Sequence, residues 1–279
     1  MAILFILYSF CFLTTIFKTL FMKSLKSSTI FFALLSIFFS CKKNTDSSPT
    51  LTPEAIAKGS LLFHLHTNID STEVLYGDTA LDASGRKIVL SIAQFYISGI
   101  TAQNTDGSVV TFPGVYLLKK TETEPYAVGS IPAGNYTSVS FVIGLDSIAN
   151  TNSPSMFSDS SNVLSAQTPS MWFGNVSQGY IFMNVQGFAD TTLDKTGLPN
   201  IPFSFKIGSN KLCRKVTMPQ QNFTVTANQQ QEIHMVCDYG KLIQGINFKT
   251  QNTTDTYTIN PSVANQIANN IPSMFSYAW

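Results

Sequence analysis

Residues 128–146 read VGSIPAGNYTSVSFVIGLD, and this stretch decides the fold class. Apolar and polar residues alternate on either side of a Pro132-Ala133-Gly134 turn, which predicts two antiparallel strands. Upstream, IVLSIAQFYISGI (88–100) and VVTFPGVYLL (109–118) flank an Asp106-Gly107 turn in the same manner. The helical period of 3.6 residues is absent from these segments, so we expect β-structure throughout them.

The same pattern continues in both directions from this region. We expect further strands at 61–66, 179–187, 202–208 and 214–218, and a hairpin of 222–227 with 231–239. Eight to ten strands with short turns predict one all-β domain over residues 59–279, an antiparallel β-sandwich. Asn260-Pro261 is typical of a helix start, and apolar residues recur every fourth position after it. A short amphipathic helix is therefore predicted over 261–275.

Charge and motif content exclude several classes of function. The chain has 279 residues, a net charge of +1 and only 12% charged residues. It has no clustered Lys and Arg, so we expect no nucleic-acid binding. The sequence contains no nucleophile elbow, phosphate-binding glycine loop, HExxH or CxxC motif. We therefore expect a protein that is not an enzyme.

The N-terminal region is typical of a targeting signal. Residues 22–40 place Lys23 and Lys26 before an apolar run that ends at Ser40-Cys41, as in a lipoprotein signal peptide with Cys41 as the lipidated residue. An ordinary signal, or one membrane anchor, remains the alternative. Residues 1–21 are interpreted as an over-called start, and the polar segment 41–58 as a flexible tether. These features predict a lipid-anchored protein of the cell envelope, at the outer membrane, on its periplasmic face or the cell surface.

Three histidines form the candidate metal site. In the strand at 61–66, Leu61, Phe63 and Leu65 share one face, whereas His64 and His66 lie on the other. His234 likewise lies opposite the apolar face of its own strand. Imidazole suits copper, zinc and nickel. If the first and last strong strands are neighbours, the three imidazoles converge on one ion; the alternative is an exposed polar face that happens to contain histidine.

Glu232 and Tyr257 are candidate fourth ligands of the metal ion.

The two cysteines of the predicted domain are Cys213 and Cys237. A secreted chain meets an oxidising environment, so they are predicted to form a disulfide; buried thiols and thiolate ligands are the alternatives. The long polar segment 147–178 carries Trp172, which is predicted either to be partly exposed near a partner-contact surface or to close the end of the core.

Four stretches give the chain a recognisable resemblance: SIAQFYISGITAQNTDGS (91–108), IPAGNYTSVSFVIGLDS (131–147), SQGYIFMNVQG (177–187) and FSFKIG (203–208). Over about Leu61 to Tyr239 the chain resembles the MbnP-like copper-binding proteins, which include Bacteroidetes lipoproteins. The resemblance implies an extracytoplasmic copper-binding role, often alongside a dihaem partner enzyme of the cytochrome-peroxidase type. Many relatives carry a Met-aromatic-Trp-x-Trp run, where this chain has Met171-Trp172-Phe173 with one Trp.

Three functions are therefore weighed, of which the third and least favoured is a redox enzyme or redox substrate. The first is a non-catalytic, lipid-anchored envelope protein that binds copper for its acquisition or handling. The second is a β-sandwich module of the cell surface that binds glycan or protein without a metal, using the polar 147–178 segment and exposed aromatic residues.

Overall fold

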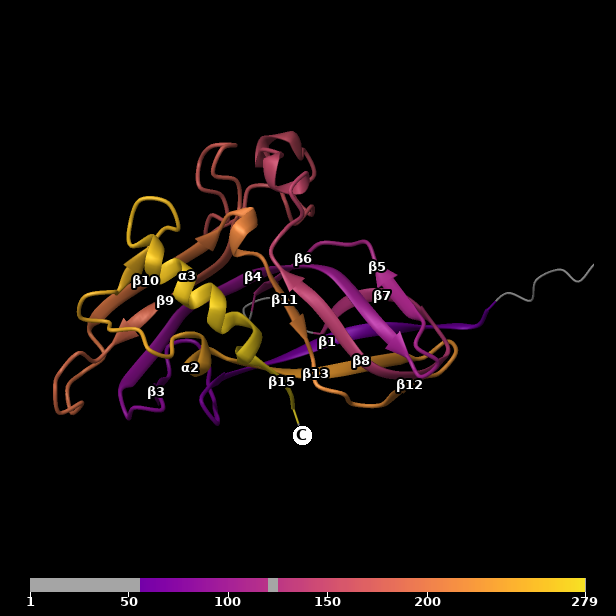
Figure 1. The fold of residues 1–279 in the computed structure, drawn as a ribbon, viewed down its shortest axis with the longest axis horizontal. Helices are drawn as coiled ribbons and strands as arrows, with labels where there is room; N and C mark the ends of the chain where they lie inside the picture. Colours follow the sequence, from indigo (N-terminus) through magenta and orange to yellow (C-terminus); the bar gives the residue numbers. More distant parts are fainter. Residues whose placement is uncertain (1–55, 120–124, 279) are drawn as a thin grey trace, which may run out of the picture. The chain divides into compact units, whose positions relative to one another are not determined.

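The computed structural model describes residues 56–119 and 125–278. Within these residues, two mixed β-sheets pack face to face as a curled sandwich, and a short helix lies near the C-terminus (Figure 1). The predicted β-sandwich with a short C-terminal helix is confirmed. Cys41, the predicted signal peptide at 22–40 and residues 41–55 of the predicted tether lie outside the described residues.

Sheet A carries the histidines and is centred on two long neighbouring strands. Its strands, in spatial order, are β15 (Phe275–Tyr277), β13 (Gln230–Asp238), β1 (Lys58–Ile69) and β2 (Thr72–Glu73), with β7 (Tyr126–Pro132) also paired to β1. The apolar side chains of β1 turn inward every second residue, as the sequence alternation predicts.

Sheet B is organised around β4 (Lys87–Asn104), an 18-residue strand. The spatial order is β11 (Arg214–Thr217), β8 (Gly134–Ile143), β4, β9 (Ile181–Ala189), β10 (Ile201–Gly208) and β14 (Thr253–Thr254). Three short strands also pair with β4, namely β3 (Thr79–Leu81), β5 (Val109–Phe112) and β6 (Tyr116–Lys119), and β12 (Phe223–Val225) pairs with β8. The β4–β8 register shifts between Ser98 and Thr101, where Gly99 has a φ of 55° that favours glycine.

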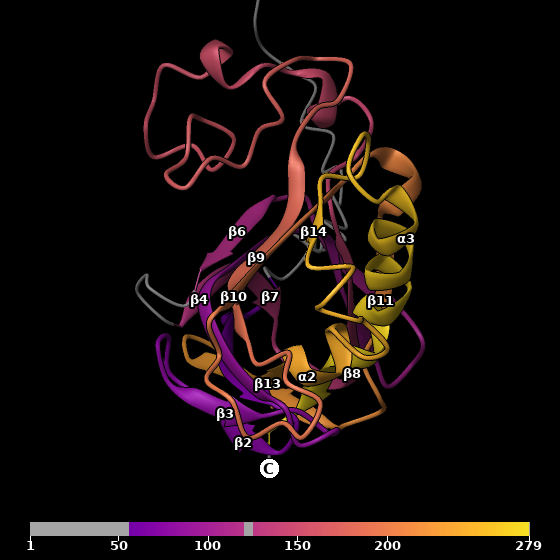
Figure 2. The ribbon, with the colours of Figure 1, turned by 90° about the vertical axis from the view of Figure 1, so that its left-hand side faces the viewer.

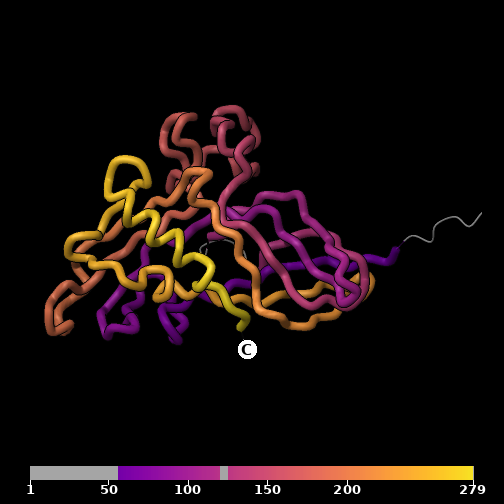
Figure 3. Tube along the Cα trace, in the orientation of Figure 1, coloured from indigo at the N-terminus to yellow at the C-terminus, as the bar shows by residue number. Residues whose placement is uncertain are grey.

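The central pair of sheet A corrects the expectation of a wholly antiparallel fold. Strands β1 and β13 lie side by side (Figure 3) and run parallel, and the register places His64 opposite His234. Strands β10 and β14 are also parallel. Parallel neighbours need a long connection, and here residues 70–229, more than half of the chain, separate the two strands of the β1–β13 pair.

The predicted hairpin of 222–227 with 231–239 is not formed. Strand β12 pairs with β8 in sheet B, whereas β13 pairs with β1 and β15 in sheet A. The short Asn-Gln-rich connection therefore carries the chain from one sheet to the other. Local spacing could not distinguish this crossing from a hairpin, because both need only a tight turn.

The C-terminal helix is shorter than the predicted 261–275. Helix α3 spans Pro261–Asn270; a 3₁₀ turn, η4 (Ile271–Met274), follows, and the chain then joins sheet A as β15. Pro272 lacks the N–H that an α-helix needs, which accounts for the change. Asn260 precedes the helix with a φ of 47° but makes no side-chain cap. Among the described residues, no helix is both long and apolar enough to cross a membrane.

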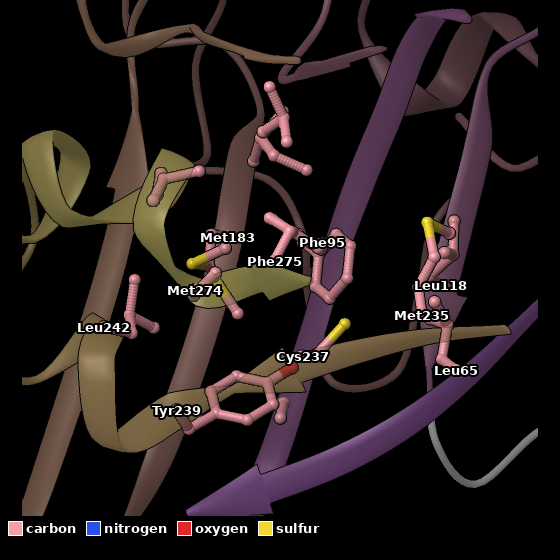
Figure 4. Packing of buried hydrophobic residues seen from close by; sticks show 14 of the residues in the cluster. Leu65, Phe95, Leu118, Met183, Met235, Cys237, Tyr239, Leu242, Met274 and Phe275 are labelled. Carbon is pink, nitrogen blue, oxygen red and sulfur yellow. The ribbon is translucent and has the colours of Figure 1, made fainter. Parts of the chain in front are cut away.

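The main core lies between the two sheets, and Figure 4 shows part of it. The helical turn α2 (Tyr239–Leu242) follows β13 directly and buries its apolar residues there. Phe95 from β4 and Phe141 from β8 both pack against Phe275 of β15, with ring centroids 5.8 and 5.1 Å apart. These aromatic contacts join the sheets behind the strands that carry the histidines.

The predicted disulfide between Cys213 and Cys237 is not formed, and both residues are thiols. Cys237 belongs to the main core beside Phe95 (Figure 4). Cys213 instead follows the turn η3 (Asn210–Leu212), packs against a smaller apolar cluster and donates to the carbonyl of Leu145 at 3.4 Å. The two cysteines thus occupy different clusters. Burial raises the pKa of the Cys213 thiol.

That smaller cluster lies under the polar segment 147–178. The segment contains two 3₁₀ turns, η1 (Ala149–Thr151) and η2 (Pro154–Met156), and extends beyond the ends of the sheet strands (Figure 2). Tyr180, at its base, is buried, and its hydroxyl donates to the carbonyl of Leu164 at 2.6 Å. Burial raises the pKa of Tyr180 to about 12, so the phenol remains a donor at neutral pH.

Candidate metal centre

Strand register brings the three predicted histidines together on the outer face of sheet A. His64 and His66 lie two residues apart on β1, so both side chains leave the same face. On β13, His234 is directly opposite His64. Because the paired strands keep the same side-chain alternation, Leu65 and Met235 turn into the core while the histidines turn outward. The predicted convergence of the three imidazoles is confirmed.

The imidazole rings form one compact group. The ring centroids of His64 and His66 are 4.9 Å apart, those of His64 and His234 are 4.7 Å apart, and those of His66 and His234 are 5.6 Å apart. One donor nitrogen from each residue lies within 4.8 Å of the others. Nε2 of His66 lies 3.3 Å from Nδ1 of His234.

This spacing fits a metal ion. Nitrogen ligands bind zinc-like ions at about 2.0 Å, so two of them on a tetrahedral ion lie about 3.3 Å apart. The His66–His234 pair therefore already has the separation of two ligands. The widest nitrogen pair, up to 4.8 Å apart, must close by about 1.5 Å to share the same tetrahedral ion. His234 is 46% exposed, which leaves its side chain room to rotate.

Two carboxylates border the histidines. Glu232 Oε2 lies 3.4 Å from Nε2 of His234 and 3.8 Å from Nδ1 of His64. Glu73 Oε1 lies 3.2 Å from Nδ1 of His66. The predicted ligand candidate Glu232 is thus at the site. Glu73 was not predicted, because it belongs to the two-residue strand β2 and reaches the histidines only through the turn after β1.

A polar groove of 1240 Å³ opens beside the cluster and includes His66 and His234 in its wall. At its other end, Asp238 accepts hydrogen bonds from the backbone nitrogens of Asp70 and Gly240 at 2.8 and 2.9 Å. Burial raises the pKa of Asp70, and the charge of Asp238 adds to this. The groove gives solvent and small solutes direct access to the imidazoles.

Tyr257, the other predicted fourth ligand, lies elsewhere. It follows β14 in sheet B, its hydroxyl donates to the carbonyl of Gln178, and its ring packs edge-on against Phe173 at 5.1 Å. It is absent from the groove that contains His66 and His234. The expectation of a metal ligand at Tyr257 is wrong, because the strand before it pairs with β10 instead of approaching sheet A.

Trp172 is half-buried at the edge of the smaller apolar cluster. Its ring packs edge-on against Tyr180 with centroids 4.8 Å apart, and the two residues form an isolated β-bridge. Both sequence interpretations therefore hold in part, since the side chain closes the cluster and keeps an exposed portion. A role in contact with a redox partner stays a prediction.

Comparison with known proteins gives a consistent result. A family model described as MbnP matches residues 58–261. The solved structure of MbnP from Methylosinus trichosporium is similar with a TM-score of 0.50 and 13% sequence identity, over 72% of this chain and 82% of that protein. At this identity the structural likeness shows the fold alone. No curated protein matches the chain significantly.

Proposed function

The chain belongs to the MbnP family, and we propose that it is a copper-binding protein of the cell envelope in which His64, His66 and His234 hold the ion. The observation that carries this proposal is the group of three imidazoles with donor nitrogens within 4.8 Å of one another. Two carboxylates beside them add negative charge, which favours a cation at this place.

The choice of copper rests on donor chemistry together with the sequence resemblance to copper-binding relatives. The three histidines offer nitrogen donors without a thiolate, a set that suits copper, zinc and nickel. Among divalent first-row ions, such sites bind Cu²⁺ most strongly. Copper is the cargo in this proposal, and the protein performs no catalytic step of its own. Its residues bind the ion and orient the rings.

The exposed setting of the site suits acquisition or handling of copper. The histidines stand on the outer face of sheet A at an open groove, so an ion reaches them without unfolding of the domain. The rigid β1–β13 pair fixes the backbone beneath the rings, and only side-chain rotation is needed on binding. A bound ion that keeps one side toward the groove is accessible to an incoming chelator.

Copper titration of the purified protein tests the proposal. We expect one Cu²⁺ per chain, with binding that weakens in acid because the ligand is neutral imidazole and protons compete for it. Zn²⁺ and Ni²⁺ titrations serve as comparisons and should give weaker binding. A protein that takes up no stoichiometric metal would instead favour the metal-free binding module considered from the sequence.

Location at the envelope is proposed from the signal sequence. Cys41 carries lipid, and the segment from 41 to 58 tethers the domain. We expect Cys41→Ser to leave the precursor uncleaved or release the protein from membranes, because several acyl chains on one Cys give stable anchoring. Mass spectrometry and membrane fractionation measure this. An unchanged mature mass and unchanged membrane association in the variant would exclude lipidation.

A further inference from the structure

Each carboxylate beside the histidines faces an outer ring nitrogen. Glu73 Oε1 is 3.2 Å from Nδ1 of His66, and Glu232 Oε2 is 3.4 Å from Nε2 of His234. The other nitrogens of these two rings, Nε2 of His66 and Nδ1 of His234, face each other at 3.3 Å. The outer nitrogen of each ring therefore contacts a carboxylate, and the two inner nitrogens contact each other.

The hydrogen bond that Glu73 accepts favours one tautomer of the His66 ring. A carboxylate accepts hydrogen bonds, so in the neutral imidazole it draws the proton to the nitrogen that it faces. In the neutral ring, His66 then carries its proton on Nδ1. Nε2 of His66 is then left with a lone pair directed toward His234, where it can bind a cation.

We propose that Glu73 is a positioning residue of the metal centre, which fixes His66 in the tautomer that presents Nε2 to the ion. Glu232 makes an ion-pair contact with His234 and also lies 3.8 Å from Nδ1 of His64, so the orienting role is assigned to Glu73 alone and Glu232 stays the candidate fourth ligand. The proposal rests on the proposed function. Hydrogen-bonded carboxylates behind ligating histidines fix ring orientation and raise ligand basicity.

Strand geometry explains how Glu73 reaches this position. The turn after β1 reverses the chain, and β2 pairs with the end of β1 so that Asn68 lies opposite Glu73. His66 is two residues before Asn68 on the same face, and the long glutamate side chain spans that step. Glu73 is 63% exposed, so its contact with His66 adds little to folding stability and is available for ring orientation.

Glu73 is not placed as a ligand in this arrangement. Its carboxylate lies on the Nδ1 side of the His66 ring, whereas the nitrogen that faces His234 is Nε2. The two nitrogens of one imidazole point in divergent directions, so an ion at Nε2 lies away from the carboxylate. The effect of Glu73 on the metal must therefore pass through the His66 ring.

The first measurement reads the tautomers in the metal-free protein. Long-range ¹H–¹⁵N NMR correlations of the histidine rings, taken above the imidazole titration range, should show His66 protonated on Nδ1 in wild type. In Glu73→Ala, we expect a shift toward the Nε2-protonated form that predominates in free imidazole side chains. Asp78→Asn is the matched control, because it removes one carboxylate that instead accepts from the backbone nitrogen of Leu75.

The second measurement is Cu²⁺ affinity with an electron paramagnetic resonance spectrum of each variant. We expect Glu73→Ala to bind about 100-fold more weakly and Glu73→Gln, which keeps an acceptor oxygen, about 10-fold more weakly. The copper spectrum should retain its nitrogen couplings, since no ligand is lost. Asp78→Asn should match wild type in affinity and spectrum.

The outcomes separate this proposal from the proposed function. If wild type binds no copper, the proposed function fails first. If wild type binds copper while Glu73→Ala keeps both its affinity and the His66 tautomer, the positioning role is overturned and the copper site stands. Loss of a nitrogen coupling in Glu73→Ala, or a spectrum of a different class, would also contradict a role confined to orientation.

Discussion

Replacement of His234 by alanine is expected to lower the affinity for Cu²⁺ by at least about 100-fold, because losing a ligand costs no less than losing the carboxylate behind it. His234 supplies the only imidazole from β13 and stands opposite His64 and 3.3 Å from His66. Without it, two histidines on one strand remain, and their side chains leave the backbone roughly 7 Å apart.

The stability of the fold should hardly change in this variant. The His234 side chain is 46% exposed, and substitutions at such positions usually alter the free energy of unfolding by less than about 0.5 kcal/mol. Thermal unfolding of the metal-free protein therefore checks that the fold is intact. Isothermal titration with Cu²⁺ then measures the affinity.

Matched variants make the result specific. His64→Ala and His66→Ala should each lose affinity to a similar degree, whereas Ser276→Ala, which changes another residue of the groove wall beside β13, should stay within about twofold of wild type. Equal affinity in wild type and all three histidine variants would show that copper binds elsewhere. Retained affinity in His234→Ala alone would indicate a surface chelate on β1.

Much of the metal centre could be predicted from the sequence because it depends on a local rule. Side chains of a strand alternate between two faces, so the apolar positions 61, 63 and 65 fix the direction of His64 and His66. The same reasoning applies to His234 between Ile233 and Met235. The sequence could not show that β1 and β13 are neighbours, because the pairing of strands far apart in the chain leaves no local signal.

Most of the features that sequence reasoning missed depend on long-range placement. The parallel direction of β1 and β13 is set by how the chain returns after sheet B. Glu73 belongs to a strand too short to show alternation, and it contacts His66 only because β2 folds back on β1. The expected pairing of Cys213 with Cys237 followed from the oxidising compartment, which gives no information on the distance between two cysteines.

The boundary of the C-terminal helix is a different kind of error, because a local signal existed. The apolar residues at 263, 267, 271 and 275 suggest one continuous helix, yet Pro272 interrupts it. The chain therefore leaves the helix, and Phe275 enters sheet A as part of β15. Phe275 packs in the core as part of a strand, as it would have done in a helix. The periodicity of apolar residues alone could therefore not show that the helix ends before it.

Phe275 also indicates where the fold is most sensitive. Phe141 of β8 is completely buried, and its ring packs against Phe275 of β15 at 5.1 Å and against Phe63 of β1 at 6.1 Å. These contacts connect sheet B to two strands of sheet A. Phe63 immediately precedes His64 on the opposite face of β1, so the aromatic group lies directly behind the metal centre.

We expect Phe141→Ala to lower the free energy of unfolding by about 3–5 kcal/mol, the usual cost of removing a buried aromatic side chain and leaving a cavity. Urea unfolding followed by circular dichroism measures this. The matched control is Phe188→Ala in β9, the same substitution at a side chain that is 40% exposed, where we expect a loss below about 1.5 kcal/mol. A loss for Phe141→Ala no larger than for Phe188→Ala would contradict the packing that joins the sheets.

Under conditions where Phe141→Ala is still folded, its affinity for Cu²⁺ should match wild type, because β1 and β13 keep their register and the substituted ring touches none of the three imidazoles.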